Sequence, residues 1–170
     1  VHGTAGPACA HEHHQSLAGR SLGWRDDRWT ERPAGSGREL CWFPEPVGAR
    51  DCYRGELADP LVLQQAFPDV DRITARVSAT RRDRMTARLP MLSPPHAEGG
   101  IGALRVEARG ADASGARVTE IVGIAELIGT AAAAVAAAMV DVVIDRRASG
   151  ASVPAPSRAG AFSLRSVLTR

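Results

Sequence analysis

The strongest folding signal in this sequence is a pair of alternating segments in the second half of the chain. In the stretch 104–109, Leu104, Val106 and Ala108 alternate with charged side chains. A second alternating run follows at 117–125, and the turn-forming stretch GADASGA separates the two. A period of two is typical of strands that bury one face. The two segments therefore predict an antiparallel hairpin.

Helix signals and further strand signals flank this hairpin. Asp59 and Pro60 suit the start of a helix that ends before Pro68. Thr80 and Asp83 have the spacing of a capping box at the start of a second helix. The other expected elements are helices at 15–22, at 129–147 with Thr130 as its cap, and at 161–170, and strands at 39–43 and 72–80.

Strands of period two mixed with helices predict an α+β fold. We expect a mixed, largely antiparallel sheet with helices packed on one face. At 170 residues the chain is long enough for one ordinary hydrophobic core. The expected organisation is a loose lead-in at residues 1–14, followed by a single α+β domain at 15–170.

Composition excludes several classes of function. The 21 basic residues nearly balance the 19 acidic ones, so nothing electrostatic favours nucleic acid as a partner. All the basic residues are arginine, which rules out a Schiff-base or P-loop lysine. The longest apolar run, 127–140, is too short and alanine-rich to predict a membrane span, and no signal peptide is visible. Three cysteines without a CxxC pattern favour a reduced, cytoplasmic location.

Nucleotide-binding and hydrolase motifs are missing as well. The glycine-rich stretches at 35–37 and 99–102 lack the preceding strand and the following helix of a dinucleotide-binding motif. Neither a Walker A sequence nor a GxSxG sequence occurs. We therefore expect this chain alone to bind no cofactor and to supply no catalytic residue.

Two groups of side chains could serve as metal or redox ligands. His11, His13 and His14 lie close together, but a zinc site needs four converging ligands and no second pair is visible. We interpret them as solvent-facing and predict no metal. Cys41 and Cys52 are eleven residues apart and have no assigned base, so we interpret them as small buried side chains.

Three segments resemble saccharopine dehydrogenase-like oxidoreductases. These are DRWTERPAGSGRELCWFPEPVG at 27–48, GELADPLVL at 55–63 and LRVEARGADASGARVTEIVG at 104–123. The helical stretch at 129–140 follows in the family's order. The resemblance covers about residues 15–170, and it matches the part of such proteins that follows the nucleotide-binding region.

The resemblance implies a substrate-binding and dimerisation domain of an NAD(P)-dependent oxidoreductase. In the family a Rossmann domain binds NAD(P), so this chain would need such a domain in cis or in trans and would not be active alone. A small-molecule substrate and a homodimer are implied in the same way. The alternative is a non-catalytic interaction or structural module derived from that fold.

The resemblance also places a substrate cleft beside the strand and turn near residues 41–54. The implied substrate-side residues are Trp42, Phe43, Glu45, Arg50 and Tyr53. Arg50 would hold a carboxylate through two hydrogen bonds, and Glu45 would orient the substrate or accept a proton. The alternative is that Trp42 or Phe43 belongs to the core and that the Glu45–Pro46 segment is a rigid turn.

Overall fold

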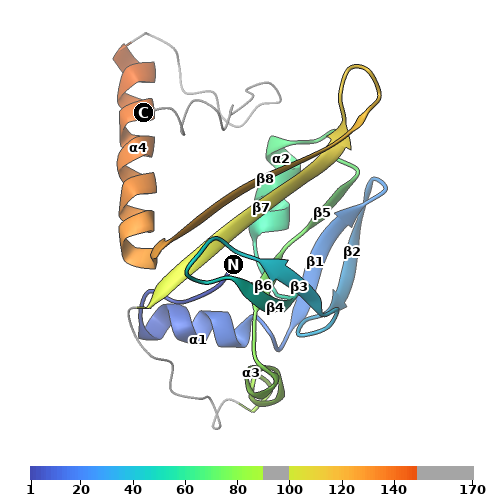
Figure 1. Cartoon of the computed structure of the whole chain (residues 1–170), viewed down its shortest axis with the longest axis vertical. Helices are drawn as coiled ribbons and strands as arrows, with labels where there is room; N and C mark the ends of the chain where they lie inside the picture. The colour runs from blue at the N-terminus through green and yellow to red at the C-terminus, as the bar shows by residue number, and fades with distance from the viewer. Residues whose placement is uncertain (90–99, 149–170) are drawn as a thin grey trace.

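The computed structural model describes residues 1–89 and 100–148 (Figure 1). The helices are α1 (Pro7–Gln15), α2 (Asp59–Ala66), α3 (Arg81–Thr86) and α4 (Ile128–Ala148). The strands are β1 (Arg20–Arg25), β2 (Arg28–Pro33), β3 (Glu39–Trp42), β4 (Ala49–Arg54), β5 (Arg72–Thr74), β6 (Arg76–Ser78), β7 (Ile101–Ala111) and β8 (Arg117–Leu127). The predicted α+β class with antiparallel pairing is confirmed, and the pairing is divided among three sheets with the orders β2-β1-β5, β3-β4-β6 and β7-β8.

The sheet β3-β4-β6, which we call the middle sheet, forms the centre of the core because both faces of β4 are buried. Cys52 and Tyr53 are neighbours in this strand, so their side chains point to opposite faces. Each belongs to one of two hydrophobic clusters. One cluster consists of Phe43, Val47, Cys52 and Ala103, and the other of Leu17, Tyr53, Val77 and Ala87. The strand at 49–54 is therefore the element around which the rest of the chain packs.

The first two residues connect the middle sheet to the long hairpin. Ser78 N donates to Val1 O over 2.8 Å, and His2 exchanges two backbone hydrogen bonds with Ala103, at 2.8 and 2.9 Å. Figure 1 marks the N-terminus close to β6 and β7. The stretch 1–14, expected as a loose lead-in, thus pairs with two strands and contains most of α1.

The hairpin β7–β8 packs against the core through one face and exposes the other. Ala103 pairs with Ala125, and both side chains contact the Phe43 cluster. The opposite face carries Leu104, Val106, Val122 and Ile124. We call these four side chains the outer face, and between 37% and 47% of each residue's surface is exposed. The predicted hairpin is confirmed, but its apolar face points away from the core.

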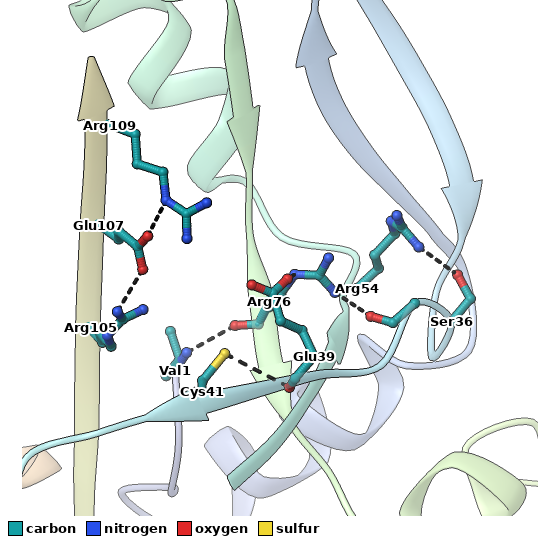
Figure 2. A network of polar contacts seen from close by, with 10 residues as sticks. Val1, Ser36, Glu39, Cys41, Arg54, Arg76, Arg105, Glu107 and Arg109 are labelled. Carbon is teal, nitrogen blue, oxygen red and sulfur yellow. Dashed lines mark hydrogen bonds and ion pairs between the residues drawn. The ribbon is translucent and has the colours of Figure 1, made fainter. Parts of the chain in front are cut away.

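The charged side of the hairpin lies on the face that packs against the core (Figure 2). Arg105 pairs with Glu107 at 2.6 Å, and Arg109 donates to the same carboxylate. These hydrogen bonds, first that from Arg109, lower the pKa of Glu107. A half-buried hairpin normally turns its apolar face inward and its charges toward water. Here the arrangement is the reverse.

The β1–β2 hairpin has no counterpart among the predicted elements. A helix was expected at 15–22, but α1 ends at Gln15 and β1 begins at Arg20. The two strands are joined at Asp26 and Asp27, whose φ angles of 50° and 57° are those of a type I′ turn. Aspartate tolerates this left-handed conformation better than most residues. Two adjacent aspartates therefore close a tight turn without the usual glycine.

The other predicted elements form with small differences. The helix at Asp59 is present as α2, and the Thr80–Asp83 capping box has both of its reciprocal hydrogen bonds. The strand expected at 72–80 is divided into β5 and β6, which belong to different sheets. The last helix follows β8 directly, so Thr130 lies within α4 and does not cap it.

Two further observations concern the helices. The helix expected at 161–170 lies outside the described residues. Within 1–89 and 100–148, no helix is both long enough and apolar enough to cross a membrane.

We predict that Leu17→Ala destabilises the fold strongly. Leu17 is 2% exposed and packs with Tyr53 and Val77. Truncating such a side chain costs about 2–5 kcal/mol of unfolding free energy. Urea denaturation measures this loss, with Met85→Ala as the control because Met85 is 65% exposed. The control is expected to change stability by less than about 0.5 kcal/mol. Equal effects of the two substitutions would contradict the assigned core.

Candidate functional site

A groove of about 600 Å³ lies where the first residues of the chain, β4, β6 and the start of β7 meet. This volume is within the range of small-molecule sites. The polar side chains that line it include His2, His13, Arg50, Ser78 and Asp83. They come from segments that are far apart in the sequence, and the pairing of residues 1–2 with β6 and β7 brings them together.

Ser78 is the polar centre of the groove. Its hydroxyl oxygen lies 2.6 Å from His2 Nδ1, and its carbonyl oxygen accepts a hydrogen bond from His13 Nε2 over 2.8 Å. Burial lowers the pKa of His2, and the charges of Arg50 and His13 lower it further. The His2 ring is therefore neutral at neutral pH and can accept the hydroxyl proton of Ser78.

This serine–histidine pair has the geometry of a nucleophile and its base. Acyl transfer also needs a group that orients the imidazole and donors that stabilise an oxyanion. The other contact of the His2 ring in the described chain is with Phe43, at a centroid distance of 6.1 Å. No carboxylate among the described residues hydrogen-bonds to His2. The pair therefore suits the binding of a polar ligand better than it suits catalysis.

Arg50 gives the groove a positive charge. It is exposed, its Nη1 donates to Ala49 O over 2.9 Å, and within the described residues it forms no ion pair. The neighbouring Asp51 pairs with Arg38 at 2.9 Å, while its Oδ1 is buried without a hydrogen-bond partner in the described part of the chain. Arg50 therefore offers a guanidinium to a ligand that carries a carboxylate.

Of the predicted substrate-side residues, Arg50 lines the groove and the others do not. Phe43 and Tyr53 are 6% and 5% exposed and belong to the two core clusters. Trp42 is 66% exposed on β3. Glu45 is exposed in the turn that contains the cis Glu45–Pro46 bond. The core alternative describes Phe43, and the turn alternative describes Glu45.

His2, His13 and Ser78 were not among the predicted site residues. Ser78 is 76 positions from His2 and 65 from His13, so no local motif links them. The available signal was the alternation at 72–80, which places Ser78 on the polar face of the expected strand, together with Thr74 and Arg76. The two histidines come close to Ser78 only when the chain is folded, so the sequence alone could not show this contact.

The histidine cluster and the cysteines fit their predicted roles only in part, since Cys52 is buried but Cys41 is half-buried. His14 is 2% exposed, and its Nε2 lies 2.9 Å from Thr86 Oγ1. The prediction that these histidines face solvent is therefore correct for His11 but wrong for His14 and for His13, which lines the groove. Among the described residues, no three His, Cys, Asp or Glu side chains are arranged to hold a metal ion. Burial raises the pKa of the Cys52 thiol to about 12, so it is not a nucleophilic thiolate at neutral pH.

Comparisons with known proteins do not identify a family for this chain. No family model matches it, and no curated protein matches it. The resemblance to saccharopine dehydrogenase-like oxidoreductases therefore stays a prediction. The functional interpretation depends on the groove and on the exposed apolar surfaces.

We predict that His2 makes the stability of the fold depend on pH. Because the folded state lowers its pKa below the usual 6.5, the unfolded chain takes up a proton first as the pH falls. This contribution to stability is present above pH 6.5 and is lost progressively below it. Urea denaturation between pH 8 and pH 5 should show a shallower loss for His2→Gln than for the unsubstituted chain.

His11→Gln is the matched control, because His11 lies on the exposed side of α1. It should retain the pH dependence of the unsubstituted chain. If His2→Gln and His11→Gln give the same profile, His2 does not carry the effect.

Proposed function

We propose that this chain is the substrate-binding and dimerisation domain of a saccharopine dehydrogenase-like NAD(P)-dependent oxidoreductase, and that it acts in the cytoplasm. A Rossmann domain, in cis or in trans, would supply the cofactor. The observation that carries the proposal is the combination of a small-molecule groove at Arg50 with the exposed apolar side chains of the outer face of the hairpin. Free cysteines at 9, 41 and 52 fit a reduced compartment.

The groove supports the substrate-binding part. Arg50 provides a guanidinium without an ion pair among the described residues, and such a group binds carboxylates through two parallel hydrogen bonds. His2 and Ser78 add polar atoms with fixed positions beside it. A small substrate with a carboxylate is the chemistry that fits these groups best.

The outer face of the hairpin supports the dimerisation part. It consists of four neighbouring aliphatic side chains without a charge among them. Contiguous exposed apolar surface of this kind marks interaction sites, and symmetric dimers are the commonest assembly that buries it. Apolar side chains on α4, such as Val135 and Met139, are also exposed and would suit contact with a second domain.

A non-catalytic interaction module derived from the same fold is the second candidate. It is favoured by the placement of Phe43 and Tyr53 in the core, which removes two of the implied substrate contacts. The genomic DNA upstream of this sequence separates the two candidates. An in-frame segment with a GxGxxG motif would support the enzyme domain, and its absence would favour the module.

We predict that the chain alone does not bind NADPH. Nucleotide binding in this proposal requires a Rossmann domain, so a titration followed by NADPH fluorescence should show no saturable change with the chain by itself. Saturable binding should appear when a Rossmann domain encoded next to it is added. Tight NADPH binding by the isolated chain would contradict the proposal.

A further inference from the structure

One face of the β2-β1-β5 sheet carries basic and hydroxyl side chains around a glycine. The register places Gly23 of β1 opposite Thr30 of β2 and Thr74 of β5, and directly opposed residues share a face. The same face carries Ser21, Arg25, Arg32 and Arg72. Because Gly23 has no Cβ, no side chain fills the centre of this face, where a Cβ would lie 3.5 Å from Thr30 Oγ1 and 4.0 Å from Thr74 Cγ2.

This face borders a cavity of about 100 Å³. Such a volume holds several water molecules, so the cavity accommodates a group of phosphate size. Arg25, Arg32, Arg54 and Arg72 line it, and no carboxylate does so among the described residues. Arg25 already pairs with Asp26 at 3.2 Å, which leaves three arginines for a ligand.

The glycine-rich turn at 35–37 holds Arg54 in place at the wall of the cavity. Gly35 N donates to Arg54 O over 2.8 Å, and Arg54 N donates to Ser36 O over 3.0 Å. Gly37 has a φ of 64°, and a Cβ there would overlap the Arg54 guanidinium. Figure 2 shows the Arg54 side chain next to that of Ser36. The glycines therefore serve to position an arginine.

The positive charge around the cavity exceeds what the described carboxylates neutralise. Arg76 pairs with Glu39 at 2.8 Å (Figure 2). Arg32, Arg54 and Arg72 form no ion pair within 1–89 and 100–148. Burial lowers the pKa of Arg54, and the charges of Arg76, Arg32 and Arg72 lower it further. These like charges interact with one another, and a bound anion would relieve their repulsion.

We infer that this cavity binds a phosphate group, either inorganic phosphate or the terminal group of a small organic phosphate. Arg32, Arg54 and Arg72 offer planar guanidinium groups that match phosphate oxygens through paired hydrogen bonds. The Thr74 side chain also lines the cavity, with its methyl group toward Gly23. The site lies on a different sheet from the Arg50 groove, so it does not depend on the proposed function.

Isothermal titration calorimetry with inorganic phosphate, in a chloride buffer of constant ionic strength, tests this site. The full chain should show saturable binding. Arg32→Gln and Arg72→Gln should each weaken it about tenfold, because each removes a charge-assisted contact. Both arginines are exposed, so neither substitution is expected to unfold the chain.

Arg117→Gln is the matched control, since Arg117 is an exposed arginine at the start of β8 and does not line the cavity. It should leave phosphate affinity unchanged. Absence of saturable binding, or equal weakening by all three substitutions, would overturn the inference and indicate only general attraction to positive charge.

Titration with adenosine monophosphate distinguishes inorganic phosphate from a small organic phosphate as the ligand. Tighter binding than inorganic phosphate indicates an organic phosphate, and equal or weaker binding indicates the free ion.

Discussion

The register of the β7–β8 hairpin determines which surface of this molecule is left open. Pairing Ala103 with Ala125 puts two small side chains against the core, and the strict alternation of a strand then sends Leu104 and Ile124 to the other side. A shift of one residue would reverse the faces and bury the larger side chains. The chain instead buries Ala103 and leaves Leu104 and Ile124 exposed to water, which costs free energy relative to burying them. A partner on the outer face, as proposed above, would bury these side chains.

The same hairpin is tied to the rest of the fold through the first two residues. His2 pairs with Ala103 on one side, while Val1 accepts a hydrogen bond from Ser78 on the other. This short connection forms one wall of the Arg50 groove and positions the His2 ring against the Ser78 hydroxyl. The groove and the hairpin therefore share His2, which contacts both Ser78 and Ala103.

Local patterns predicted much of the fold, because capping and alternation depend on near neighbours. The Thr80–Asp83 box and the long hairpin are present as expected. The β1–β2 hairpin escaped prediction because its Asp26–Asp27 turn lacks glycine. The direction in which the long hairpin faces could not be predicted, since alternation defines two faces but not which one meets the core. The groove depends on contacts across more than sixty residues, and of the predicted site residues only Arg50 reaches it.

Sedimentation equilibrium of Val122→Lys and Thr119→Lys tests most directly whether the outer face is an interface between two copies of the chain. Both positions are exposed on β8, but Val122 lies on the outer face and Thr119 on the opposite one. The unsubstituted chain and Thr119→Lys should form dimers with similar affinity. Val122→Lys should weaken the dimer at least about tenfold, because a charge would be buried among aliphatic side chains. A monomeric unsubstituted chain at high concentration, or equal effects of the two lysines, would contradict the proposed interface.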